Sequence, residues 1–456
     1  MSSTPTAQRV LMRLAWPAVV ENLSATMVIM IDSAMVGSLG AAATAAVAVN
    51  ASPSWLIGGL AASLGVGATA LVSRMIGAGD QAGAQRAGRQ ALLLSLMLST
   101  VLMVLALLCA PLIPRWMGAD PLIHADAASY LRIIGLAFIP NQLGMMAGAL
   151  LRGAGDTRSP MRAALLNHLI NITGNFLLIY PTRAVSLLGL TFTMPGAGMG
   201  VQGAAIATGI ANAVAGLYLV RLLLTGRGAL PIPLTPQWRP EREMAGRILR
   251  IALPASMERV SINLGQIVFA CMVASLGTHT LAAHHLAITV ESLGYMPGFG
   301  FSVAAATLVG QNLGAGDYQR ARHFGLRAIG TGTLLMTGSG ILMFFFADWL
   351  IALFTPDPTV RQIGAMLIRI CAIEQPFSAL SIIAPGALRG AGDTVAPFRV
   401  ALLSMWGVRL VLAWLLGTVA GLGIRGIWYA MVIDLGVRGI LLLLRFLRGG
   451  WQHTRV

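Results

Sequence analysis

Long apolar stretches alternate with short polar segments along the whole chain. About twelve of these stretches reach the roughly 20 residues that a helix needs to cross a bilayer. The pattern therefore predicts an all-α polytopic membrane protein. We expect transmembrane helices near 14–38, 51–75, 88–112, 128–150, 161–180, 200–223, 250–275, 287–312, 326–350, 363–388, 398–420 and 424–446.

Composition argues against several other classes of protein. The 456 residues are 56% hydrophobic and only 10% charged, which is too apolar for the surface of a soluble domain. The net charge of +15 comes from arginines scattered between the apolar stretches, without the basic tract that nucleic-acid binding requires. The cysteines and histidines lack metal-ligand spacing, so we expect no metal, and surface positions for His279, His284 and His285.

The arginines also predict how the chain lies in the membrane. With the N-terminus inside, most of the 31 arginines fall in segments on the cytoplasmic side. We therefore expect a multi-pass protein of the cell inner membrane, with the lipid bilayer as a partner and both termini in the cytoplasm. The first apolar stretch contains Glu21 and Asp32 and is too long for a signal-peptide core, so it is expected to stay as a helix.

One polar turn occurs four times on that predicted cytoplasmic face. LRGAGDT at Leu151–Thr157 returns 237 positions later at Leu388–Thr394, and GAGD at Gly77–Asp80 returns with the same offset at Gly314–Asp317. Glycine permits the left-handed backbone that ends a helix, and the aspartate can cap the next helix. A phosphate-binding loop would need a preceding strand and a following Lys-Ser/Thr, and the sequence offers neither.

The constant offset indicates an internal repeat of two halves with six helices each, in which Glu21 matches Glu258. Because each half has an even number of spans, both halves enter the membrane the same way up. They are then related by a pseudo-two-fold axis along the membrane normal. The predicted domains are an N-terminal six-helix lobe (1–224), a cytoplasmic inter-lobe linker (225–249) and a C-terminal six-helix lobe (250–456).

As a set, these features resemble the multidrug and toxic compound extrusion (MATE) family. They are the two six-helix halves, Trp16-Pro17 early in the first helix, Asp32 in an I-D-S context, and the repeated LVGQNLGAGD (Leu308–Asp317) and LRGAGDT turns. The resemblance implies a secondary active multidrug efflux antiporter, not an enzyme. Such a protein exports amphipathic organic cations or drugs in exchange for H⁺ or Na⁺. We expect drug-like small molecules as its partners, no cofactor beyond the coupling ion, and a monomer.

Polar groups present in only one half are the better candidates for a site, because shared features build the fold. Asp32 is matched by Phe269, and Asn171 and Asn175, four apart on one helix face, are matched by Val408 and Leu412. An acid inside a membrane is costly and usually functional. We predict that Asp32, Asn171 and Asn175 form the cation- or proton-coupling site, as the resemblance also implies. The alternative is a role in packing between helices.

The second half has its own acids within predicted helices. Glu291, Glu374 and Glu258 form a possible second-lobe site, although Glu258 is mirrored by Glu21 and so also fits a scaffold or gating role. The family's usual acids in helices seven and ten are replaced here by Ile262 and Ser378. Further on, Asp434 and Arg438 are four apart and are interpreted as a structural pair, and Pro17 is expected to let the first helix bend.

Three other functions are alternatives to this interpretation. A purely structural or channel protein is disfavoured by the acids that occur in only one of two otherwise matched halves. A flippase for lipids or lipid-linked precursors, of the same superfamily, would share the helices but should have a more basic central cavity. Only Arg259, Arg409 and Arg438 are candidates for such a cavity. A membrane-embedded enzyme would need a clustered nucleophile or metal site, and none is evident, so no catalytic residue is predicted.

Overall fold

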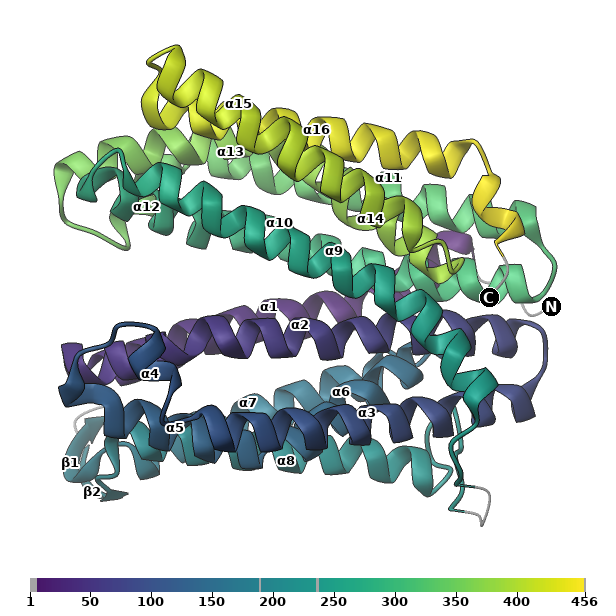
Figure 1. Cartoon of the computed structure of the whole chain (residues 1–456), viewed down its shortest axis with the longest axis horizontal. Helices are drawn as coiled ribbons and strands as arrows, with labels where there is room; N and C mark the ends of the chain where they lie inside the picture. Colours follow the sequence, from purple (N-terminus) through teal and green to yellow (C-terminus); the bar gives the residue numbers. More distant parts are fainter. Residues whose placement is uncertain (1–5, 188–189, 235–237, 455–456) are drawn as a thin grey trace.

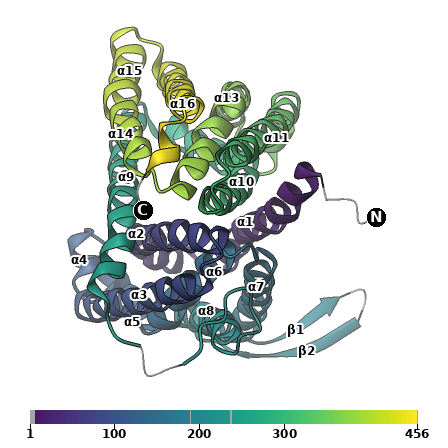
Figure 2. The same ribbon diagram turned by 90° about the vertical axis from the view of Figure 1, so that its right-hand side faces the viewer.

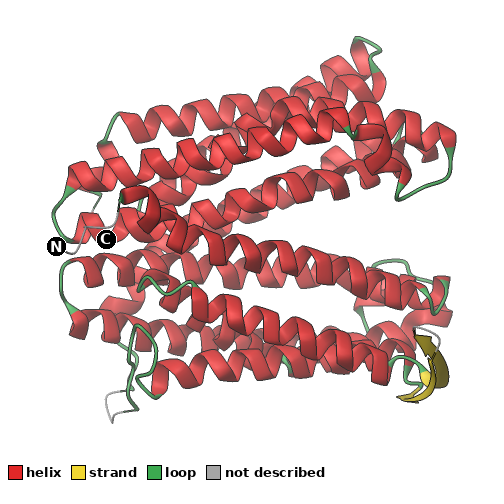
Figure 3. Cartoon of the chain, turned by 180° about the vertical axis from the view of Figure 1, so that it is seen from behind, coloured by secondary structure: helices red, strands yellow, loops and turns green. Residues whose placement is uncertain are grey.

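The computed structural model describes residues 6–187, 190–234 and 238–454. The chain forms two lobes of long helices that run lengthwise beside each other (Figure 1). The start of α1 and the end of α16 lie at one end of the molecule. The small hairpin lies at the opposite end (Figure 3).

The first lobe contains the helices up to residue 224 and one hairpin. Its long helices are α1 (Ala7–Gly37), α2 (Ala41–Gly77), α3 (Gln81–Cys109), α5 (His124–Leu136), α6 (Phe138–Gly153), α7 (Arg158–Leu178) and α8 (Gly200–Leu224). Its short elements are α4 (Ile113–Trp116), η1 (Pro121–Ile123), β1 (Pro181–Leu187) and β2 (Leu190–Ala197). The two strands pair antiparallel in the connection between α7 and α8.

The second lobe repeats this plan. Its long helices are α9 (Arg242–Ala274), α10 (Thr278–Gly314), α11 (Tyr318–Phe345), α13 (Pro358–Gly390) and α16 (Gly423–Leu447). One further span is built from α14 (Val395–Leu403), η2 (Ser404–Arg409), α15 (Leu410–Trp414) and η3 (Leu415–Val419), in which η2 and η3 are π-helical. The short elements are α12 (Ala347–Ala352) and η4 (Gly450–His453). Since α9 starts at Arg242, its first turns lie inside the predicted linker.

Eleven of the twelve predicted spans are long and apolar enough to cross a membrane, and one is less apolar. Of the described helices, ten are long and apolar enough to cross a membrane, and α5 with α6 form an eleventh span bent by 49°. The remaining helix, α7, has 21 residues but also carries Asn167, His168, Asn171 and Asn175. The most polar of the predicted spans is therefore the one that supplies two candidate site residues.

The four repeated turns have the geometry that their sequence predicts. The second glycine of each GAGD has positive φ, namely 74° at Gly79, 91° at Gly155, 76° at Gly316 and 83° at Gly392. Each aspartate then accepts a hydrogen bond from a backbone N–H of the next helix. The acceptors and donors are Asp80 from Gly83 (2.7 Å), Asp156 from Ser159 (3.0 Å), Asp317 from Arg320 (2.8 Å) and Asp393 from Ala396 (3.2 Å).

The first helix of each lobe packs into the other lobe at the end where these turns lie. Leu11, Leu14 and Val19 of α1 are buried in a core with residues of α10, α11 and α13. In return, Met244 and Ile248 of α9 are buried in the core of α2, α3, α6 and α8. The view along the helices shows α1 and α2 at the boundary, facing α10 and α9 (Figure 2). This exchange follows the repeat, because α9 is the counterpart of α1.

Candidate functional site

Asp32 lies five residues before the end of α1, far from the repeated turns, and is held by two amides of α7. Asn175 Nδ2 donates to Asp32 Oδ1 at 2.7 Å. The Asn171 amide is satisfied when its oxygen accepts from Thr208 Oγ1 at 3.0 Å and its nitrogen donates to Asp32 Oδ1 at 2.7 Å. The structure thus brings together the three residues that the sequence grouped, and adds Thr208 of α8.

No cation balances this carboxylate within the described part of the chain. Asp32 makes no ion pair there, and its hydrogen-bond partners are neutral amides. Asn171 and Asn175 are 3% and 1% exposed, while Asp32 itself is half-buried. In addition, Asn175 Oδ1 is buried and has no hydrogen-bond partner among the described residues. A buried acceptor without a partner is uncommon, and such an oxygen can accept a hydrogen bond from an added proton or contact a cation.

Glu291 of α10 and Glu374 of α13 meet in the interior of the second lobe, together with Cys371. A ligand atom from each of these three side chains lies within 4.8 Å of the others. Glu374 is 0% exposed, and its Oε1 accepts from Ser378 Oγ at 3.1 Å. Glu374 is therefore in contact with Ser378, the residue that the sequence comparison within the family placed at the position of the usual acid. Sequence reasoning missed Cys371, because a cysteine three residues before a glutamate has no recognisable ligand spacing.

Asp434 of α16 anchors two arginines next to this cluster. Arg409 Nε donates to Asp434 Oδ2 at 2.8 Å, and Arg438 Nη2 lies 3.1 Å from the same oxygen. Ser404 Oγ also donates to the Asp434 carboxylate. Asp434 is fully buried, and both arginines contact its carboxylate there. The expected pair between Asp434 and Arg438 is present, and Arg409 extends it to a triad.

Glu258 does not join the acid pair but forms an ion pair that is repeated in the other lobe. Arg389 Nη2 of α13 contacts Glu258 Oε1 at 2.7 Å, and Arg152 Nη1 of α6 contacts Glu21 Oε1 at 3.0 Å. Both arginines belong to the LRGAGDT motif. Sequence reasoning interpreted that motif only as a turn, although the shared offset of the two arginines and the two glutamates could have indicated the pairing.

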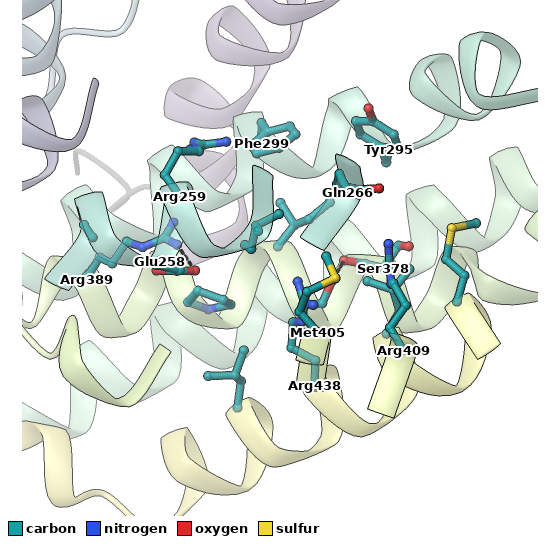
Figure 4. A pocket seen from close by; sticks show the side chains of 18 of the residues that line it. Glu258, Arg259, Gln266, Tyr295, Phe299, Ser378, Arg389, Met405, Arg409 and Arg438 are labelled. Atoms are coloured by element: carbon teal, nitrogen blue, oxygen red, sulfur yellow. Dashed lines mark hydrogen bonds and ion pairs between the residues drawn. The ribbon is translucent and has the colours of Figure 1, made fainter. Parts of the chain in front are cut away.

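Adjoining cavities lie between the lobes, where α2 faces α9, α10 and α13. Two of them have volumes of about 350 and 330 Å³, and both are lined by Ala62, Val66, Arg259, Phe299 and Arg389. Glu291 and Glu258 line the larger one. Figure 4 shows Arg259 beside Phe299, and Arg389 joined to Glu258. The site is thus an apolar and aromatic space with ionisable groups at its walls.

At their predicted cytoplasmic ends the lobes are in direct contact. Thr307 Oγ1 of α10 donates to Arg152 O at 2.9 Å, and Gln311 Nε2 donates to Gly153 O at 3.1 Å. Arg74 Nη1 of α2 donates to Thr454 O, beyond η4, at 2.7 Å. These contacts close the end of the molecule that carries the repeated turns.

His284 and Pro17 differ in how the structure bears on their predictions. The surface position expected for His284 is wrong: its side chain is 2% exposed, and Trp428 Nε1 donates to its Nδ1 at 3.2 Å. Burial follows because α10 runs on through His284 toward the interior instead of starting near 287. Pro17 lies within α1, which is one continuous helix, and the bending expected at Pro17 stays a prediction.

The two lobes, the membrane-spanning helices and the cavity between them define a multi-pass membrane transporter. The MatE family model matches residues 17–177 and 254–415, which are the corresponding segments of the two lobes. The chain therefore belongs to the MatE family, and the resemblance seen in the sequence is confirmed.

Curated and solved relatives agree with this assignment. The chain is 30% identical to the probable multidrug resistance protein NorM of Thermotoga maritima, covering 99% of this chain and 95% of that one. It is also 30% identical to the multidrug resistance protein PmpM of Pseudomonas aeruginosa, with 98% and 92% covered. A solved structure of a multidrug resistance MATE family transporter in an outward-facing conformation superposes with a TM-score of 0.88 at 24% identity, covering 97% and 95%. That structural likeness confirms the fold with its two lobes.

Proposed function

We propose that the protein is a secondary active multidrug efflux antiporter, which exports amphipathic organic cations or other drugs in exchange for H⁺ or Na⁺. The observation that carries the proposal is Asp32. It is an acid inside a membrane helix, has no counterpart in the other lobe, and accepts hydrogen bonds from neutral amides without a balancing cation among the described residues. An uncompensated intramembrane acid is most simply a binding site for a cation.

A proton would rearrange the hydrogen bonds around Asp32. The ionised carboxylate only accepts, whereas the neutral acid donates one O–H and so needs an acceptor. Asn175 Oδ1 is the acceptor that has no partner, and rotation of its amide would turn it toward the acid. Na⁺ would instead collect the oxygens of Asp32, Asn171, Asn175 and Thr208, because it prefers oxygen ligands. Either ion neutralises the carboxylate and shifts the contact between α1 and α7.

The inter-lobe cavity is the proposed binding site for the substrate. Its apolar and aromatic walls suit an amphipathic compound, and Glu291 supplies a second acid. If the closed end is cytoplasmic, as the arginines predict, ion entry from the outside would release the substrate to the same side. Glu291 and Glu374 are then a possible second-lobe ion site, while the ion pair of Glu258 with Arg389 favours a gating role for Glu258.

The test is transport in proteoliposomes under a proton gradient or a Na⁺ gradient imposed separately. We expect the wild type to move a fluorescent cation such as ethidium under one gradient, and Asp32→Asn to reduce that movement to background. The neutral amide keeps the size of the side chain but cannot release a proton or balance a cation. Asp126→Asn, at an exposed position of α5, is the matched control and should transport as the wild type does.

The result would count against the proposal if Asp32→Asn transported normally at equal protein levels, because Asp32 would then serve packing. A wild type that moved no drug under either gradient would also refute it. The flippase alternative has one observation in its favour: arginines line the cavity at 152, 259, 389, 409 and 438, so the cavity is more basic than the sequence suggested. Translocation of a lipid diphosphate in the same vesicles would favour that alternative.

A further inference from the structure

Arg259 of α9 differs from the other arginines at the inter-lobe cavity. It lines both central cavities and a third one against α2, and its side chain is exposed to this space. Its stem packs across Gly59 of α2, where an added Cβ would lie 3.0 Å from the Arg259 Cγ. The residue therefore reaches from the second lobe to the surface of the first.

The other arginines of the cavity already have a carboxylate partner. Arg152 is paired with Glu21, Arg389 with Glu258, and Arg409 and Arg438 share Asp434. Within the described ranges, Arg259 makes no ion pair and donates no hydrogen bond. Glu258 is its neighbour in the chain, but the Glu258 carboxylate is occupied by Arg389 at 2.7 Å. A full positive charge is thus left facing a partly apolar space, which is costly unless it serves a ligand.

The internal repeat shows that Arg259 is not among the features that the two lobes share. Each lobe has one ion pair of a glutamate with the LRGAGDT arginine, so these pairs belong to the shared architecture. The counterpart of Arg259 in the first lobe is Asn22, which lines the same cavity and turns its amide back to Ala18 O at 2.7 Å. The positive charge is therefore one-sided, as the negative charge of Asp32 is.

We propose that Arg259 is a substrate-binding residue that recognises an anionic group on an amphipathic substrate, through the guanidinium in the cavity and with Phe299 and Met145 against the apolar body. A guanidinium offers two parallel N–H donors that match a carboxylate or a phosphate. Phe299 lines both central cavities beside Arg259 (Figure 4), and Met145 lines the smaller of these two and the third cavity. The inference deepens the proposed function and rests on it for transport, but it concerns binding and can be tested alone.

The anionic group could belong to a zwitterionic drug or to a lipid phosphate, and the experiment separates these sources. Binding to the purified protein is measured for norfloxacin, for the ethyl ester of norfloxacin, for ethidium and for farnesyl diphosphate. The ester keeps the amine and the ring system but has no carboxylate. We expect the wild type to bind norfloxacin about tenfold or more tightly than the ester, which corresponds to one charge-assisted contact.

Arg259→Gln should abolish this preference without preventing folding, because glutamine fills the space and remains polar. Norfloxacin affinity is expected to fall about tenfold, while the ester and ethidium bind as before. Arg259→Lys keeps the positive charge but lacks the two parallel N–H donors of the guanidinium. It should therefore recover only part of the preference for norfloxacin over its ester. Arg322→Gln, at an exposed position of α11, is the matched control for loss of one positive charge and should change nothing.

The outcomes are distinct. Arg259-dependent binding of norfloxacin supports a zwitterionic drug, and Arg259-dependent binding of farnesyl diphosphate alone supports the anionic group with a lipid phosphate as its source. Equal losses for norfloxacin and ethidium in Arg259→Gln would overturn the inference, as would equal affinities of the wild type for norfloxacin and its ester together with no binding of the diphosphate. Failure of Asp32→Asn to affect transport would bear on the proposed function instead.

Discussion

At the scale of single residues, the repeat supplies a natural comparison between two ion pairs that differ in burial. Glu258 is 8% exposed in its pair with Arg389, whereas Glu21 is 25% exposed in its pair with Arg152. Removing the arginine leaves a carboxylate without its partner, and the cost grows as water is excluded. Arg389→Gln should therefore destabilise the protein by about 2–3 kcal/mol, and Arg152→Gln by about 1 kcal/mol or less.

Thermal denaturation of the purified variants measures this difference directly. Adding Glu258→Gln to Arg389→Gln should restore part of the lost stability, since the uncompensated charge disappears. Equal shifts of the two single variants would mean that burial does not govern these pairs. A double variant less stable than Arg389→Gln would mean that the carboxylate has another partner.

The sequence could predict the members of the first-lobe site but not all of their contacts. Asp32, Asn171 and Asn175 were found because each lacks a polar counterpart in the repeat and because the asparagines are one helical turn apart. Thr208, in contrast, lies 37 positions from Asn171 on another helix, and ordinary helix packing brings it there. A contact between helices has no local pattern, so only the fold can reveal it.

At the scale of elements, the crossing of α2 and α10 depends on two glycines of the repeated turns. A Cβ at Gly77 would lie 1.8 Å from Gln311 O, and a Cβ at Gly314 would lie 1.9 Å from Arg74 O. Neither backbone atom can move aside alone. Gly314→Ala is therefore expected to separate the helix ends and to favour the conformation that is open at this end.

Distances between spin labels at Arg86 of α3 and Arg322 of α11, both exposed near the turns, report this opening. Gly314→Ala should lengthen the mean distance by several ångströms. Gly330→Ala in α11, where an added Cβ has nothing within 4 Å, is the control and should leave the distance unchanged. An unchanged distance in Gly314→Ala would show that the crossing tolerates a methyl group and does not hold this end closed.

The sequence predicted an element well where one residue type determines the backbone conformation, and poorly where no such residue is present. The four turns follow from glycine at positive φ and a capping aspartate. The break between α5 and α6 was not predicted, because the apolar pattern runs on through it. Pro140 is its physical cause: it has no N–H to donate to Leu136 O, and its ring crowds the preceding turn. The hairpin β1–β2 has no strong alternation of apolar and polar residues, and the sequence predicted only helices.

At the scale of the whole molecule, the lobes meet at the closed end through α1, α2, α6, α9, α10 and the segment after η4. The first helix of each lobe lies in the core of the other, so a rotation of the lobes must move these two helices together. The pseudo-two-fold relation could be predicted from the constant offset in sequence. The packing of α1 and α9 into the opposite lobes could not be predicted. The sequence of an apolar helix does not show which apolar surface the helix packs against. The boundaries of the predicted domains stay predictions.

The arginines predict which side of the membrane the closed end faces, and that side decides whether the cavity opens to the outside or to the cytoplasm. Most arginines lie near the repeated turns and the chain ends, so we expect this end in the cytoplasm and the hairpin outside. Alkaline phosphatase fused after Thr193 in β2 should be active, because it folds only outside the cytoplasm, and a green fluorescent protein fused after Val456 should fluoresce. If both reporters gave the opposite result, the cavity would be open to the cytoplasm. Ion entry would then load the substrate rather than release it, and the direction proposed for transport would be wrong.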